Sequence, residues 1–154
     1  DIEKLSNQKI LVLDGIRDPG NLGTIIRTAD WFGIHSIIAS KDTVDCYNPK
    51  VVQATMGGLF RCEMHYEDLS VLLELKKLNS SFRIFGAVLS GQDLSPLAEY
   101  KSSAGALIIG NESLGISEPV QLMIDHQVTI PRKGVAESLN AAISASILLH
   151  EWSN

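Results

Sequence analysis

The residues from Ile130 to Ala142 read IPRKGVAESLNAA and join two segments of different character. Residues 127–130 have the pattern of a short strand, and proline ends strand pairing because it has no N–H to donate. Small and apolar residues then predict a helix over residues 139–151. Ser138 or Asn140 can cap that helix, and free N–H groups at a helix start attract polar ligands. The stretch therefore predicts a strand–loop–helix junction, which is either a plain connection or part of a binding site.

Outward from this junction, short hydrophobic runs alternate with helical patterns along the chain. Strands are predicted over residues 9–13, 35–39, 61–66, 83–89, 104–109 and 127–130. Helices are predicted over residues 22–32, 48–55, 68–78, 117–124 and 139–151, and a polar loop is expected from Ser90. This alternation predicts an α/β fold with a mostly parallel six-stranded sheet and helices on both faces.

Two other polar stretches also follow predicted strands. Residues 18–29 read DPGNLGTIIRTA and come after the first strand, and residues 110–115 read GNESLG and come after the fifth. Ligands of open α/β sheets bind beyond the carboxyl ends of the strands. Because parallel strands bring these ends to one edge, we expect the three stretches to meet in a shared site.

In this order and at this spacing, the three stretches resemble the signature motifs of the SpoU (TrmH-type) RNA ribose 2′-O-methyltransferases of the SPOUT superfamily. The resemblance extends from about Ile10 to Trp152. It implies that S-adenosylmethionine is the cofactor and that its methyl group passes to a ribose 2′-hydroxyl of tRNA or rRNA. It also implies a C-terminal trefoil knot, which no periodicity predicts, and a homodimer whose active site can draw residues from both subunits.

The resemblance implies catalytic and cofactor-binding roles for individual residues. The matching catalytic residues are Arg27, Asn21, Glu112, Ser138 and Asn140. The matching cofactor-binding residues are Leu89, Gly110, Asn111, Gly115, Ile130, Ser138 and Leu139. Because arginine stays protonated in proteins, we expect Arg27 to stabilise the developing alkoxide or to position a phosphate, and not to act as a base.

Local structural roles compete with these functional ones. Arg27 can pair with Asp30 on the same helix, and Asn21 can be a turn or capping residue after Pro-Gly. Glu112 can be a solvated loop carboxylate between glycines that serve turn geometry. The side chains of Ile130 and Leu139 are expected to pack in the core. The sequence leaves the alternatives open for the polar residues.

Length and composition limit the class of protein. A chain of 154 residues with 45% hydrophobic and 20% charged residues has the size and composition of one globular domain. We expect residues 9–154 to form the methyltransferase domain, and residues 1–8 to be a linker or the end of a missing RNA-binding domain. Cys46 and Cys62 form no CxxC pair, and no Cys/His set has metal-ligand spacing. We therefore expect no metal, reduced thiols, a cytoplasmic location and, without a long apolar run, no membrane association.

The net charge of −5 opposes a large nucleic-acid surface, because phosphate neutralisation needs clustered cations. Arg17, Arg27, Arg132 and Lys133 lie in or beside the motifs and can form a local basic site. One alternative function is a non-catalytic RNA-binding or assembly module with the same fold. Another is a different small nucleotide-binding enzyme, against which the absence of P-loop and dinucleotide motifs argues.

Overall fold

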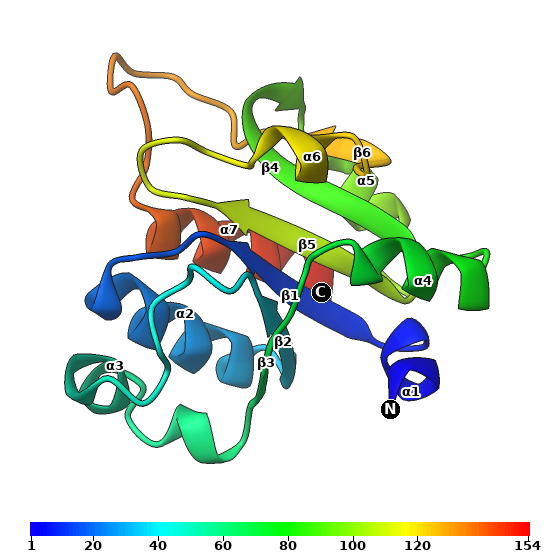
Figure 1. Cartoon of the computed structure of the whole chain (residues 1–154). Coiled ribbons are helices and arrows are strands. Elements are labelled where there is room, and N and C mark those ends of the chain that lie inside the picture. Colours follow the sequence, from blue (N-terminus) through cyan, green and yellow to red (C-terminus); the bar gives the residue numbers. More distant parts are fainter.

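The computed structural model describes residues 1–154, and a sheet of six strands with only parallel pairings lies at its centre. Across the sheet the strands are ordered β3-β2-β1-β5-β4-β6 (Figure 1). In chain order they are β1 (Lys9–Asp14), β2 (Ser36–Ala39), β3 (Glu63–Tyr66), β4 (Arg83–Gln92), β5 (Gly105–Gly110) and β6 (His126–Val128). The predicted six-stranded α/β sheet is confirmed, and its pairing is entirely parallel.

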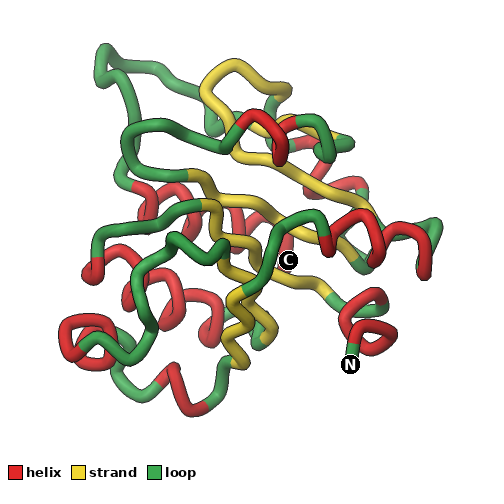
Figure 2. The backbone as a smooth tube through the Cα atoms, viewed as in Figure 1, coloured by secondary structure: helices red, strands yellow, loops and turns green.

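Helices cover both faces of this sheet (Figure 2). They are α1 (Ile2–Ser6), α2 (Pro19–Trp31), α3 (Pro49–Ala54), α4 (Val71–Leu78), α5 (Ser95–Glu99), α6 (Glu118–Gln121) and α7 (Ala141–Ser153), with a 3₁₀ turn η1 (Gly58–Phe60). Alternate residues of β1 enter two separate cores. Leu11 and Leu13 join the core that includes residues of α2 and α7, whereas Ile10 and Val12 join the one that includes residues of α4 and α6. The central strands are buried on both faces, which explains their continuous hydrophobic sequence.

Three segments differ from the sequence prediction. Part of the expected linker forms α1, because Asp1 caps it and Ile2 and Leu5 pack against the second core. The expected polar loop after Ser90 contains α5, whose Pro96 and Leu97 are buried. Strand β6 ends at Val128, so Ile130 lies beyond the sheet.

The carboxyl ends of β1, β4, β5 and β6 point to one edge of the sheet (Figure 1). The loop after β1, the loop after β5 and the long segment before α7 gather at this edge. No helix is long and apolar enough to cross a membrane. The arrangement brings the first polar stretch beside the other two, although about a hundred residues separate it from them in the sequence.

Candidate active site

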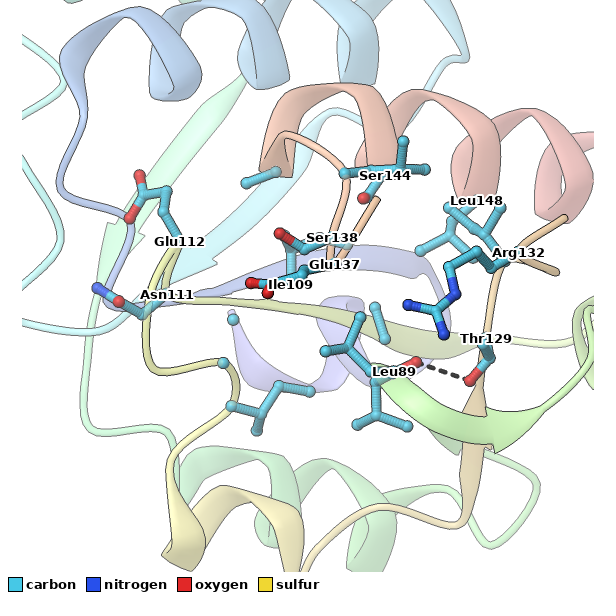
Figure 3. Close-up of a pocket in the computed structure, with 18 of the residues that line it drawn as sticks. Leu89, Ile109, Asn111, Glu112, Thr129, Arg132, Glu137, Ser138, Ser144 and Leu148 are labelled. Carbon is cyan, nitrogen blue, oxygen red and sulfur yellow. Dashed lines mark hydrogen bonds between the residues drawn. The ribbon is translucent and has the colours of Figure 1, made fainter. Parts of the chain in front are cut away.

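A cavity of about 860 Å³ lies beyond the carboxyl ends of β4, β5 and β6 (Figure 3). Its walls come from the end of β4, the loop after β5, the segment before α7 and the inner face of α7. A volume of several hundred Å³ is usual for sites that enclose a cofactor-sized molecule. The lining includes Leu89, Gly110, Asn111, Glu112, Gly115, Ile130, Ser138 and Leu139. Every residue that the sequence assigned to cofactor binding therefore lies in one cavity.

The turn in the loop after β5 requires glycine at positions 110 and 115. A Cβ on Gly110 would overlap the backbone of Gly115 and Ile116, because the loop folds directly back over this position. Gly115 has a φ of +71°, in the left-handed region where side chains are disfavoured. An antiparallel bridge between Asn111 and Gly115 closes the turn. The turn places backbone atoms, with no side chain between, on the cavity wall.

Asn111 lines the cavity, but its side chain holds two loops together. Its Oδ1 accepts hydrogen bonds from the N–H groups of Ser113 and Leu114, both at 2.9 Å. Its Nδ2 donates to the carbonyl oxygen of Gly15 at 2.7 Å. The amide therefore fixes the loop after β5 against the loop after β1, while the backbone N–H and carbonyl of Asn111 are both bonded to Gly115 in the bridge.

The Glu112 carboxylate is bonded to the loop after β1. It accepts hydrogen bonds from the N–H groups of Arg17 at 3.2 Å and Asp18 at 3.0 Å, and from Nδ2 of Asn21 at 3.3 Å. In Figure 3 its carboxylate points away from Leu89 and Arg132. Glu112 is therefore exposed, as the alternative of a solvated loop carboxylate suggested, but it also bonds the loop after β5 to the loop after β1.

Asn21 also bonds to Asn140, which lies in the third motif, residues 130–142. The hydrogen bonds of Glu112 therefore continue to that motif. Oδ1 of Asn140 caps α7 by accepting from the N–H groups of Ala142 at 2.8 Å and Ile143 at 3.2 Å. Its Nδ2 donates to Oδ1 of Asn21 at 2.9 Å. Asn21 does not cap α2, since Asp18 accepts its N–H at 2.7 Å and fills the capping position. Side chains thus connect the three motifs in the order Asn140, Asn21 and Glu112.

Two apolar side chains assigned to cofactor binding are exposed at the cavity. Leu89 is 76% exposed and Leu139 is 48% exposed, so the expectation that Leu139 packs in the core was wrong. Ile130 is half-buried and packs against the first core at the cavity wall. Ser138 forms no hydrogen bond with the protein and lies among the lining residues in Figure 3. These groups offer apolar contact and one free hydroxyl to a bound molecule.

Arg27 lies outside the cavity and forms no ion pair. The suggested partner Asp30 instead accepts from Arg61, with Nη2 at 2.8 Å from Oδ2, so the predicted alternative pairing was wrong. Gly23, one turn before Arg27, leaves no space for a ligand because α3 packs onto it: a Cβ there would lie 2.8 Å from the Val51 carbonyl oxygen. The guanidinium of Arg27 is exposed and free to meet another molecule.

Cations flank the cavity on its open side. Arg132 donates to the Ala136 carbonyl oxygen at 3.2 Å and lies over the cavity in Figure 3, and Lys133 also lines it. Arg17 is 3.2 Å from Asp42, whose pKa is lowered by the Ser40 hydroxyl first and by Arg17 second. All residues from 131 to 140 are exposed. The cavity lining thus holds two cations, Arg132 and Lys133, beside two carboxylates, Glu112 and Glu137.

Sequence reasoning missed some cavity residues. The cavity is also lined by Thr129, which directly follows β6, and by Ser144 and Leu148 of α7. Their residue types are ordinary for a strand end and a helix face, so no local signal marks them. Only the packing of α7 beneath the loops brings them to the site.

A parallel α/β sheet with a ligand-sized cavity at its carboxyl edge defines a domain that binds a small molecule at that edge. The chain belongs to the SpoU rRNA Methylase family, whose family model matches residues 8–150. The predicted family assignment is thereby confirmed.

Three known proteins are similar to this chain. The Bacillus subtilis 23S rRNA (guanosine(2553)-2′-O)-methyltransferase RlmP is 36% identical over 151 residues, which are 96% of this chain and 59% of that protein. A putative TrmH-family RNA methyltransferase structure from Porphyromonas gingivalis is 38% identical with a TM-score of 0.83, covering 95% of this chain and 59% of that one. An AdoMet-bound rRNA methyltransferase structure from Sinorhizobium meliloti is 34% identical with a TM-score of 0.85, covering 94% and 55%. The chain thus spans little more than half the length of these relatives.

Proposed function

We propose that this chain is a catalytic domain that transfers a methyl group from S-adenosylmethionine to a ribose 2′-hydroxyl of rRNA or tRNA. The observation that carries the proposal is the Asn140–Asn21–Glu112 network, which joins all three motifs beside one cavity. The names of the relatives support it, since one is a 2′-O-methyltransferase of 23S rRNA and another was solved with AdoMet.

The residues of the cavity fit such a cofactor. Leu89 and Leu139 present exposed apolar surface for an adenine ring, and the glycine turn at Gly110 lets the cofactor approach the backbone closely. The cofactor supplies a methyl group that its sulfonium already activates. The protein then has mainly to hold acceptor and methyl in line, because proximity and orientation provide much of the rate. The 2′-oxygen would take the methyl group and release its proton to solvent, leaving the thioether S-adenosylhomocysteine as the other product.

Arg27 is proposed to act on the acceptor side. Its charge would stabilise the oxygen as the proton leaves, and no carboxylate of its own chain competes for it. Because Arg27 does not line the cavity of its own chain, the proposal includes a homodimer in which α2 and α7 face the partner. Exposed apolar side chains on these helices support that contact, with Trp31 at 84% and Ile143 at 51% exposed. Light scattering tests the dimer, and a monomer under assay conditions would remove the shared site.

RNA capture is proposed to depend on more than this domain. With a net charge of −5, the cations near the site that could meet phosphates are Arg27, Arg132, Lys133 and the ion-paired Arg17. We propose residues 9–154 as the catalytic domain and residues 1–8 as the junction to an RNA-binding domain, in keeping with the greater length of the relatives. Filter binding over a salt series should show weak affinity and a shallow slope, since each phosphate contact steepens it by about one log unit per log unit. Tight binding with a steep slope would contradict this distribution of charge.

The C-terminal part of the chain is proposed to form the trefoil knot of the family, in a cytoplasmic enzyme. Family membership supports the knot. An experimental structure tests it through the backbone path of residues 105–154.

Two measurements test the activity. Calorimetry with S-adenosylhomocysteine should show binding, and absence of binding at millimolar ligand would favour the non-catalytic RNA-binding module. Incubation with labelled S-adenosylmethionine and unmodified rRNA or tRNA should label a ribose, and mapping of that nucleotide identifies the substrate. Label found on a base would contradict the proposed reaction.

A further inference from the structure

Strand β4 leaves the sheet near its end and returns to it at the same place. Both Ala87 and Gln92 are paired with Val128 of β6, so the four residues between them bulge out of the ladder. This bulge, residues 88–91, carries Leu89 into the cavity. The four residues have no ladder partners of their own, so something else has to hold their backbone.

The Thr129 hydroxyl bonds to the bulge at two points. Its Oγ1 accepts a hydrogen bond from the Gly91 N–H at 2.5 Å and donates one to the Val88 carbonyl oxygen at 2.7 Å, the dashed line of Figure 3. The Thr129 N–H also donates to the Gln92 carbonyl oxygen at 2.6 Å. This one hydroxyl thus takes the place of the missing β-ladder hydrogen bonds on both sides of Leu89.

The close approach of the two strands at this point needs both Gly91 and Thr129. A Cβ on Gly91 would lie 2.7 Å from the carbonyl carbon and oxygen of Gln127 and 2.9 Å from the Thr129 hydroxyl. The bulge therefore sits directly on β6, with no room for a side chain at Gly91. Without the hydroxyl, the Gly91 N–H and the Val88 carbonyl would lose these bonds, which is costly for groups that are partly buried.

We infer that Thr129 is a positioning residue for the cofactor cavity. It acts through Leu89: its hydroxyl fixes the bulge in the form that places Leu89 on the cavity wall. The identity of the ligand rests on the proposed function. The role of Thr129 in ordering the bulge rests on the hydrogen bonds alone. A hydroxyl is required at this position, whereas the methyl group of threonine is not.

The test compares three variants of the 154-residue chain. Thr129→Val keeps the shape and removes the hydroxyl, and Thr129→Ser keeps the hydroxyl. Thr55→Val is the matched control, because it removes a hydroxyl that donates to the Val52 carbonyl oxygen at the end of α3, which does not line the cavity. The measurements are S-adenosylhomocysteine affinity by calorimetry, KM and kcat for methyl transfer, and amide hydrogen exchange of residues 88–91 without ligand.

Thr129→Val should weaken S-adenosylhomocysteine affinity and raise the KM for S-adenosylmethionine by about tenfold, the effect of leaving one or two polar groups unpaired. Its kcat should change by less than about threefold, because Thr129 acts on cofactor binding and not on the acceptor. Exchange of the Gly91 amide should become faster. Thr129→Ser should keep the wild-type affinity, KM and Gly91 exchange rate. Thr55→Val should leave the affinity and the exchange of the bulge unchanged.

Wild-type affinity in Thr129→Val would overturn the inference while leaving the proposed function in place. Equal losses in Thr129→Val and Thr129→Ser would overturn it too, because they would assign the effect to the methyl group. A wild-type chain that binds no S-adenosylhomocysteine would instead contradict the proposed function and the cofactor part of the inference. The exchange measurement would then still decide whether the hydroxyl orders the bulge.

Discussion

Asn140 donates a hydrogen bond of 2.9 Å to the side chain of Asn21, which lies 119 positions earlier in the chain. The same Asn140 side chain caps α7 through its oxygen. One amide therefore does two separable things: it starts a helix and it ties the third motif to the first.

The two roles of Asn140 can be separated by substitution. Asn140→Asp keeps the capping oxygen, so the thermal midpoint should change little. It removes the donor to Asn21, and methyl transfer should fall by roughly tenfold or more as the network loosens. Asn140→Ala should lose activity and also about 1 kcal/mol of stability, the usual value of a cap.

Asn48→Asp is the matched control, because Asn48 caps α3 in the same way and lines no part of the cavity. It should retain full activity. Wild-type turnover in Asn140→Asp would show that the link to Asn21 has no part in catalysis.

Arg27→Ala should lower the rate of methyl transfer by roughly 100- to 1,000-fold, the range for loss of one transition-state electrostatic contact. S-adenosylhomocysteine affinity should stay within about threefold, because the proposed role lies on the acceptor side. Arg61→Ala removes a second arginine beside α2, one that Asp30 already neutralises, and should leave the rate nearly unchanged. Equal effects of the two substitutions on the rate would indicate general loss of positive charge.

Gly110→Ala should destabilise the protein by about 1–3 kcal/mol, the usual cost of forcing an atom into a filled space. The added Cβ would overlap the backbone of Gly115 and Ile116, which cannot move aside as a flexible side chain can. Cofactor affinity should fall together with the stability, because the turn from Gly110 to Gly115 forms part of the cavity wall. Gly134→Ala is the control for stability alone, because no atom lies within 4 Å of its added Cβ but Gly134 lines the same cavity. Urea unfolding and calorimetry measure both effects, and a stable Gly110→Ala chain with full affinity would contradict this account of the turn.

The Asp30–Arg61 pair should make a pH-dependent contribution to stability. The hydrogen bond from Arg61 lowers the pKa of Asp30 below that of an unfolded aspartate. A lowered folded-state pKa means that the stabilisation is present above the unfolded pKa and is lost as pH falls through the folded one. Arg61→Ala should therefore reduce the free energy of unfolding at pH 7, and its effect should shrink as the pH falls below the unfolded pKa of aspartate. An effect of Arg61→Ala that persisted at low pH would point to packing of the side chain and not to its charge.

The sequence alone determined most of the helices and strands and the edge of the sheet that carries the site, but not α1 or α5. The buried run of β1, the proline after Ile130 and the capping Asn140 act over a few neighbouring residues. Such short-range effects follow from backbone sterics and hydrogen bonding, so they can be predicted from residue order. The parallel α/β arrangement and the meeting of the three motifs followed from them.

The tertiary structure decided which groups each side chain contacts. Nothing near Glu112 in the sequence shows that its partners are Arg17, Asp18 and Asn21. Gly23 likewise proved to be a contact for α3, and Arg27 proved to lie outside the cavity of its own chain. These contacts depend on strand order and helix packing, which set the distances between residues far apart in the chain. Thr129 is the clearest case: its sequence neighbours indicate a strand end, and only the return of β4 to Val128 places two polar groups within reach of its hydroxyl.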